Sequence, residues 1–110
     1  MRENNERLEH MLEAIEKIEK YAALGEGTFR KDELVQNWML RHVQIIGEAA
    51  RALPQEFRDQ HPSVPWNDII GMRHVLVHDY FDIDLDIVWG VVNRDIPILK
   101  REIKKIFRKN

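Results

Sequence analysis

Apolar residues recur at intervals of three and four along the first segment of the chain, with Glu and Lys between them. The stripe consists of Leu8, Met11, Leu12, Ile15 and Ile18. This spacing places one apolar face on an α-helix, and the segment predicts a helix of about 20 residues. Gly25 and Gly27 follow, and glycine is the residue that most often ends a helix, so we expect the helix to stop there.

A second helical pattern begins between Thr28 and Asp32 and runs to Pro54. Its apolar positions are Leu34, Val35, Trp38, Met39, Val43, Ile46, Ala50 and Leu53. Proline disfavours helical backbone in the residue before it, so Pro54 limits this helix. We expect a short helical turn over residues 54–59 and a proline-containing loop over residues 61–65.

A third helix is predicted from Pro65 towards His78, because proline is well suited to the first position of a helix. Asp84 is a good N-cap for a last helix of about 25 residues. Its apolar positions approach a heptad seam and are Leu85, Val88, Val92, Ile96, Leu99, Ile103 and Ile106. Pro97 lies inside this helix and should kink it.

The sequence therefore predicts an all-α fold, an up-and-down bundle of four main helices plus a short helix, forming a single domain over residues 1–110. No stretch alternates apolar and polar residues as a strand would. The long seam on the last helix and the three tryptophans indicate more apolar surface than one small bundle hides. We therefore expect a homodimer.

The composition of the chain excludes several classes of function. The 110 residues carry 17 Lys and Arg against 19 Asp and Glu, a net charge of −2, which excludes a generally basic nucleic-acid coat. No cysteine is present, which excludes disulfides, thiolate metal sites and cysteine nucleophiles. The first residues do not resemble a signal peptide, and no apolar run could cross a bilayer. We expect a soluble, cytoplasmic protein without a membrane partner.

Reactive side chains cluster between Gly71 and Phe81. They are Arg73, His74, His78, Asp79 and Tyr80. Arginine binds phosphate through two parallel hydrogen bonds, and histidine passes protons near neutral pH. This combination suits phosphodiester chemistry without a metal or other cofactor.

Helical geometry limits this interpretation. On an unbroken helix Arg73 and His78 would point about 140° apart. Either the helix ends near Val77, or two copies of the site converge across a dimer two-fold axis. The plain alternative is that Arg73 and His74 are solvated and that His78 caps a helix end.

Two further features are open to more than one interpretation. His74 and His78 have the i, i+4 spacing of a zinc pair, but Val75 stands where a metalloprotease has Glu, and we predict no metal site. Gly47 indicates a close helix–helix contact, and Glu48 lies among apolar neighbours. If Glu48 is buried it needs a partner, with Arg51 or an arginine of a second chain as candidates. A structural ion pair is favoured over a catalytic role.

The C-terminal segment is basic. Residues 100–110 contain six Lys or Arg and one Glu. Cations suit the end of a helix, and a basic amphipathic end could also bind RNA phosphates or an anionic partner. A simple solvated face explains the same pattern.

Four segments, taken together, resemble one family. The run Arg73-x4-His78-Asp79-Tyr80 resembles the R-x4–6-H-x-Y signature of HEPN-domain proteins, specifically HepT-like toxins. The other three segments are residues 45–53 (IIGEAARAL), residues 64–73 (VPWNDIIGMR) and residues 84–89 (DLDIVW). They occur in the order the family has them, and Pro97 falls where relatives often have a proline.

The resemblance implies a dimeric helical bundle that brings two R-x4–6-H motifs into one cleft. It implies a metal-independent endoribonuclease with Arg73 and His78 as the catalytic pair. It further implies the toxin of a type VII-like toxin–antitoxin pair. The antitoxin would be an MntA-like nucleotidyltransferase that transfers AMP from ATP to Tyr80. His74, Asp79 and Glu48 would support the site.

A second hypothesis comes from a different class of protein. The chain could be a non-catalytic HEPN module that binds and assists its nucleotidyltransferase. The intact arginine, histidine and tyrosine favour the ribonuclease, because a pure scaffold has no need of all three. A metal-binding helical protein acting through His74 and His78 is the third possibility.

Overall fold

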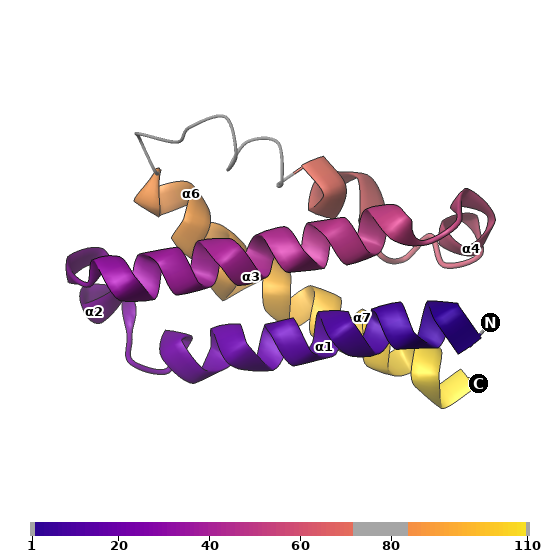
Figure 1. Cartoon of the computed structure of the whole chain (residues 1–110), viewed down its shortest axis with the longest axis horizontal. Helices are drawn as coiled ribbons and strands as arrows, with labels where there is room; N and C mark the ends of the chain where they lie inside the picture. Colours follow the sequence, from indigo (N-terminus) through magenta and orange to yellow (C-terminus); the bar gives the residue numbers. More distant parts are fainter. Residues whose placement is uncertain (1, 72–83, 110) are drawn as a thin grey trace.

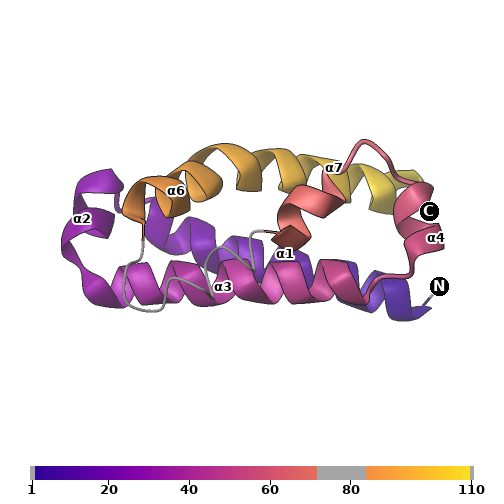
Figure 2. The same cartoon turned by 90° about the horizontal axis from the view of Figure 1, so that it is seen from above.

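The computed structural model describes residues 2–71 and 84–109, and it gives side-chain surroundings for 3–71 and 84–107. Two long antiparallel helices, α1 (Arg2–Ala22) and α3 (Glu33–Ala52), form the body of the bundle, as Figure 1 shows. The last helix crosses beside them and brings the C-terminus to the same end as the N-terminus (Figure 2). The described residues contain helices and no strand, which confirms the all-α prediction.

The predicted stripes form the core. On α1, Leu8, Met11, Ile15 and Ile18 are fully buried, whereas Leu12 is half-buried. They pack against Met39, Val43, Ile46 and Ala50 of α3 and against Leu99, Ile103 and Ile106 of the last helix. Buried apolar side chains of this size each contribute roughly 1.5–3 kcal/mol, so this seam holds the three helices together.

The start of the second helical pattern differs from the prediction. A separate short helix, α2 (Glu26–Lys31), precedes α3, and Gly27 lies inside it rather than at a helix end. Gly25 alone breaks the chain, with a positive φ of 94°. Asp32 then caps α3 by accepting hydrogen bonds from the backbone N–H groups of Leu34 and Val35.

Leu34 is a further correction, because it was expected in the buried stripe. It is 79% exposed, one residue after the start of α3. The next residue, Val35, is buried in the same turn, so Leu34 lies about 100° around the helix from the core-facing position.

The segment that follows α3 is close to the prediction. The short helix α4 (Gln55–Asp59) confirms the expected turn. Residues 66–71 are helical, and Pro65 lies one residue before the first helical residue rather than at it. The Pro65 carbonyl accepts a hydrogen bond from the Ile69 N–H at 3.1 Å.

The last helix consists of three contiguous parts, α6 (Leu85–Gly90), η1 (Val91–Asp95) and α7 (Ile96–Lys109). The η1 part is a π-turn in which the Ile96 N–H donates to the carbonyl of Val91, five residues earlier. Pro97 explains it: proline has no N–H to donate and its ring crowds the carbonyl four residues before it, and a widened turn relieves both problems. Pro97 was expected to kink the helix, and the effect that the structure shows before it is this change of helical register.

A tryptophan and a salt bridge connect α1 to α3 and α7. Trp38 on α3 donates to the Lys17 carbonyl of α1 at 2.9 Å, and its ring lies 5.1 Å from that of Tyr21. Lys100 of α7 reaches Glu19 of α1 at 2.8 Å. No helix among the described residues is long and apolar enough to span a membrane.

Candidate functional site

The reactive cluster of the sequence falls where the structure is not described. Arg73, His74, His78, Asp79 and Tyr80 all lie within residues 72–83, outside the described residues. The structure does describe both flanks of this segment, which are the helical residues 66–71 before it and Asp84 with α6 after it. The site can therefore be built up from the elements that hold its two ends.

The first flank is fixed by Trp66 and its neighbours. Trp66 is buried, and its indole N–H donates to the His61 carbonyl at 2.9 Å. Val64 and Ile69 are buried beside it. These contacts seat the helical residues 66–71 on the bundle, so the chain enters the motif from a fixed position two residues before Arg73.

The second flank begins at a capped helix end. The Asp84 carboxylate accepts hydrogen bonds from the backbone N–H groups of Asp86 and Ile87 at 3.0 and 3.2 Å, which confirms the predicted N-cap. A cap of this kind contributes about 0.5–2 kcal/mol to a helix. It fixes the point at which the chain leaves the motif.

Two contacts hold α6 against α2. The Phe29 ring lies 5.4 Å from the Trp89 ring, and Phe29 is fully buried. Arg30 donates to Asp86 at 2.6 Å and to Glu26 at 2.7 Å. Its hydrogen bond to Asp86, followed by that to Glu26, raises the pKa of Arg30 above its ordinary value. The second flank is therefore tied to an element that lies far before it in the sequence.

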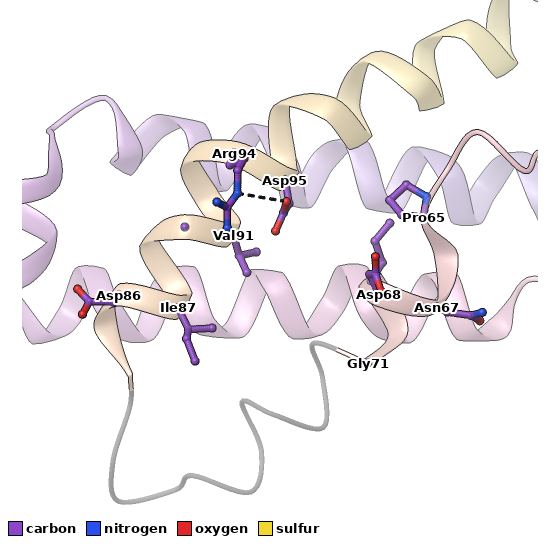
Figure 3. A pocket seen from close by; sticks show the side chains of 11 residues that line it. Pro65, Asn67, Asp68, Gly71, Asp86, Ile87, Val91, Arg94 and Asp95 are labelled. Atoms are coloured by element: carbon purple, nitrogen blue, oxygen red, sulfur yellow. Dashed lines mark ion pairs between the residues drawn. The ribbon is translucent and has the colours of Figure 1, made fainter.

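A pocket of about 680 Å³ lies between the two flanks (Figure 3). Its described lining consists of Pro65, Asn67, Asp68, Ile69 and Gly71 from the first flank and Asp86, Ile87, Gly90, Val91, Arg94 and Asp95 from the second. Pro65, Ile69, Ile87 and Val91 give it apolar walls. Gly71, its last lining residue on the first flank, is separated from Arg73 by a single residue.

The polar groups of the pocket are mainly carboxylates. Figure 3 shows Asp68 and Asp95 on opposite walls, one from each flank. Arg94 approaches Asp95 with its Nε at 3.8 Å, a loose pair on an exposed surface. The π-turn places both side chains on this wall, and such turns are frequent at functional sites. Carboxylates accept hydrogen bonds from N–H groups and repel phosphate.

Glu48 is the one predicted site residue that the structure describes. It is exposed on α3, so the condition under which it would need a buried partner is not met within the single chain. It does take part in a polar contact. Gly47 beside it is buried, as a close helix–helix contact requires. One step along a helix turns by about 100°, which explains how neighbours in sequence face core and solvent.

Sequence reasoning missed several of these residues. No sequence motif pointed to Arg94, Asp95 or Asp68. The orientation of Arg94 and Asp95 depends on the π-turn before Pro97, which the apolar pattern did not predict. His42 was also missed: it is buried in the core and its Nδ1 lies 2.7 Å from the Trp38 carbonyl. Its helical spacing from Met39 and Ile46 was the available signal.

Within residues 3–71 and 84–107, no group of three His, Asp or Glu side chains could hold a metal ion. The pair of His74 and His78 lies outside the described residues.

Comparison with known proteins places the chain in a family. The family described as ribonuclease HepT-like matches residues 11–106. A protein of Caldanaerobacter subterraneus subsp. tengcongensis named "Putative RNase" is 40% identical over 103 residues, which are 93% of this chain and 92% of that protein. "Probable ribonuclease HepT" of Thermococcus cleftensis is 37% identical over 106 residues, 96% of each chain. The chain belongs to the ribonuclease HepT-like family.

A third relative shows a similar sequence within a longer protein. "Gamma-glutamylcyclotransferase and putative RNase" of Methanocaldococcus jannaschii is 44% identical over 100 residues, which are 90% of this chain. The chain spans 45% of that relative's length. No solved structure matches the chain.

Proposed function

We propose that the protein is a HepT-like toxin that cleaves RNA without a metal ion, and that a nucleotidyltransferase antitoxin neutralises it. One observation carries the proposal. The family match runs over residues 11–106 and so includes the motif Arg73-x4-His78-x-Tyr80 with all three residues intact. The two relatives that this chain covers almost end to end both carry RNase or ribonuclease in their names.

The chemistry proposed for the motif is an internal transesterification. The ribose 2′-OH attacks the adjacent phosphorus, the bond to the 5′ oxygen breaks, and the products are a cyclic phosphate and a free 5′-OH. Arg73 stabilises the negative charge of the phosphorane. His78 accepts the proton of the 2′-OH or donates one to the leaving oxygen. His74 and Asp79 would support these groups, as would Glu48 from the exposed face of α3.

A homodimer completes this proposal, because each chain supplies one Arg73 and one His78. Two copies of His78 could then divide the acid and base roles. Exposed apolar side chains on the last helix support the idea, since Ile87 is 45% and Ile98 is 40% exposed. Ile87 also lines the pocket between the flanks.

The direct test is cleavage of cellular RNA in EDTA by the purified chain, after intact mass shows that no AMP is attached. We expect cleavage that leaves cyclic phosphate ends, and a loss of about 10²–10⁴-fold in rate for His78→Ala. Unchanged cleavage by His78→Ala would remove His78 from the mechanism.

The proposed neutralisation acts on Tyr80. The antitoxin transfers AMP from ATP to the tyrosine oxygen and releases pyrophosphate. The added group brings bulk and negative charge to the place where an RNA phosphate must lie. Incubation with the nucleotidyltransferase and ATP should add the mass of AMP to the wild type and none to Tyr80→Phe. AMP found on Tyr80→Phe would refute the assignment.

The second candidate, a non-catalytic partner module, makes an opposite prediction in cells. A ribonuclease toxin arrests growth when it is expressed without its antitoxin, and Arg73→Ala relieves the arrest. A partner module does neither.

A further inference from the structure

The exposed face of α7 is basic. Four cations, Lys100, Arg101, Lys104 and Lys105, line a shallow groove of about 420 Å³ together with Pro97. We call these four side chains the α7 basic face. They stand out in a chain whose net charge is −2, and the described lining of the groove contains no acidic residue.

The ion pairs around this face leave two of its cations available. Lys100 is held by Glu19 at 2.8 Å, and Lys105 by Glu102 at 3.3 Å. Glu102 has a side chain that is only 14% exposed, so it does little to repel an anion in the groove. Arg101 and Lys104 are exposed, and within the described part of the chain neither forms a hydrogen bond or ion pair.

We propose that the α7 basic face binds the sugar–phosphate backbone of single-stranded RNA beyond the cleaved bond. The inference rests on the proposed ribonuclease function. Residues three and four apart on a helix have Cβ atoms about 5–6 Å apart, so Arg101, Lys104 and Lys105 present closely spaced cations along one ridge. A row of this kind neutralises successive phosphates without reading bases.

The position of the face fits this role. The last helix runs without a break from α6 to the C-terminal end (Figures 1 and 2), and α6 and η1 supply one wall of the pocket. Arg94 lines the same pocket as Gly71. Lys104 lies ten positions after Arg94, which is about 15 Å along a helix, a distance that a few nucleotides can span. The pocket carboxylates, Asp68 and Asp95, repel phosphate, whereas the α7 basic face attracts it, so the backbone is directed along α7.

The lining favours RNA over an acidic protein. Pro97 is the one apolar residue in the described lining of the groove. Protein interfaces take most of their binding energy from buried aromatic and apolar residues, which this face lacks, whereas phosphate binding needs only the cations.

The test compares two double charge reversals. Arg101→Glu with Lys104→Glu alters the α7 basic face, and Lys17→Glu with Lys31→Glu alters exposed lysines on α1 and α2. Each reversal changes the net charge by two, so both variants go from −2 to −6 and carry the same general repulsion. All four side chains are exposed, and circular dichroism checks that both variants fold.

The substrates are a mixed-sequence single-stranded RNA of about 15 nucleotides and a dinucleotide too short to reach the face. We expect the Arg101 and Lys104 variant to raise KM for the long RNA at least about tenfold over the control variant, with kcat and dinucleotide cleavage unchanged. The slope of log affinity against log salt should fall by about 0.7 for each phosphate that the variant no longer neutralises.

The remaining outcomes are distinguishable. Equal KM values for the two double variants, with the wild type active, would overturn the proposal and leave the ribonuclease function standing. Loss of binding to the nucleotidyltransferase with KM for RNA unchanged would also overturn it and make the face a protein interface. A wild type that cleaves neither substrate would remove the proposed function and this inference with it.

Discussion

The scaffold helices and the flanks of the motif share one core but differ in the contacts that they add to it. α1, α3 and α7 share a seam of fully buried apolar side chains, and each position follows from helical spacing. The flanks join the same core through Val64, Ile69 and Val88. They are held in addition by directional contacts at their outer ends: the Trp66 indole N–H donates to the His61 carbonyl, Asp84 caps the start of its helix, and Arg30 donates to Asp86. Between them they leave an open pocket with carboxylates on both walls. Stability and chemistry should therefore respond to different substitutions.

The largest expected effect on stability is in the scaffold. Ile103 is fully buried and Ile98 is 40% exposed on the same helix, so the same substitution tests burial directly. Ile103→Ala should lower the free energy of unfolding by about 2–5 kcal/mol, because it leaves a cavity in the seam. Ile98→Ala should lower it by less than about 1 kcal/mol. Denaturant titration measures both, and equal losses would contradict the assigned seam.

A smaller effect is expected at the two helix caps, which should differ in their influence on RNA cleavage. Asp32 caps α3 in the scaffold, and Asp84 caps α6 at the end of the motif. Substitution of either by alanine should cost about 0.5–2 kcal/mol. Only Asp84→Ala should also lower RNA cleavage, because it loosens the point where the chain leaves the motif. Asp84→Asn keeps an acceptor and should restore both properties. A loss of cleavage in Asp32→Ala as large as in Asp84→Ala would contradict the separation.

The smallest effect concerns pH. A hydrogen bond from Ser63, with further help from Lys105, lowers the pKa of Glu102 below its ordinary value of 4.5. A carboxylate whose pKa is lowered by folding stabilises the protein above its unfolded value, and this contribution disappears as pH falls through the folded value. Thermal unfolding should therefore show a small loss of stability below pH 4.5 that Glu102→Gln removes. An unchanged acid profile in Glu102→Gln would show that the Ser63 contact contributes nothing.

The sequence predicted the scaffold well because apolar residues at helical spacing mark the face of each helix that is buried. The seam of the last helix was correct from Val88 to Ile106, and Asp84 was correctly placed as its cap. Leu34 was wrong because Leu34 and Val35 are both apolar and adjacent, and only Val35 faces the core.

The candidate site was less predictable for two physical reasons. Helix α2, which holds the second flank, begins directly after Gly25, the residue with positive φ. The sequence could not tell that Gly27, which is also a glycine, lies inside this helix. The wall formed by Arg94 and Asp95 depends on the π-turn before Pro97, which shifts every later side chain around the axis. The motif residues were singled out by their chemistry and took their roles from the resemblance. Both remain predictions, since these residues lie outside the described residues.

The central claim is that the bundle supplies stability and the motif supplies chemistry. The most direct test measures stability and RNA cleavage on the same samples of wild type, Arg73→Ala and His78→Ala. Each variant should unfold within about 0.5 kcal/mol of the wild type, because the seam that stabilises the bundle is supplied by α1, α3 and α7. Cleavage in EDTA should fall at least about 100-fold in each. Variants that keep full cleavage, or that lose cleavage only because they unfold, would contradict the claim that this motif carries the chemistry on a separately stabilised bundle.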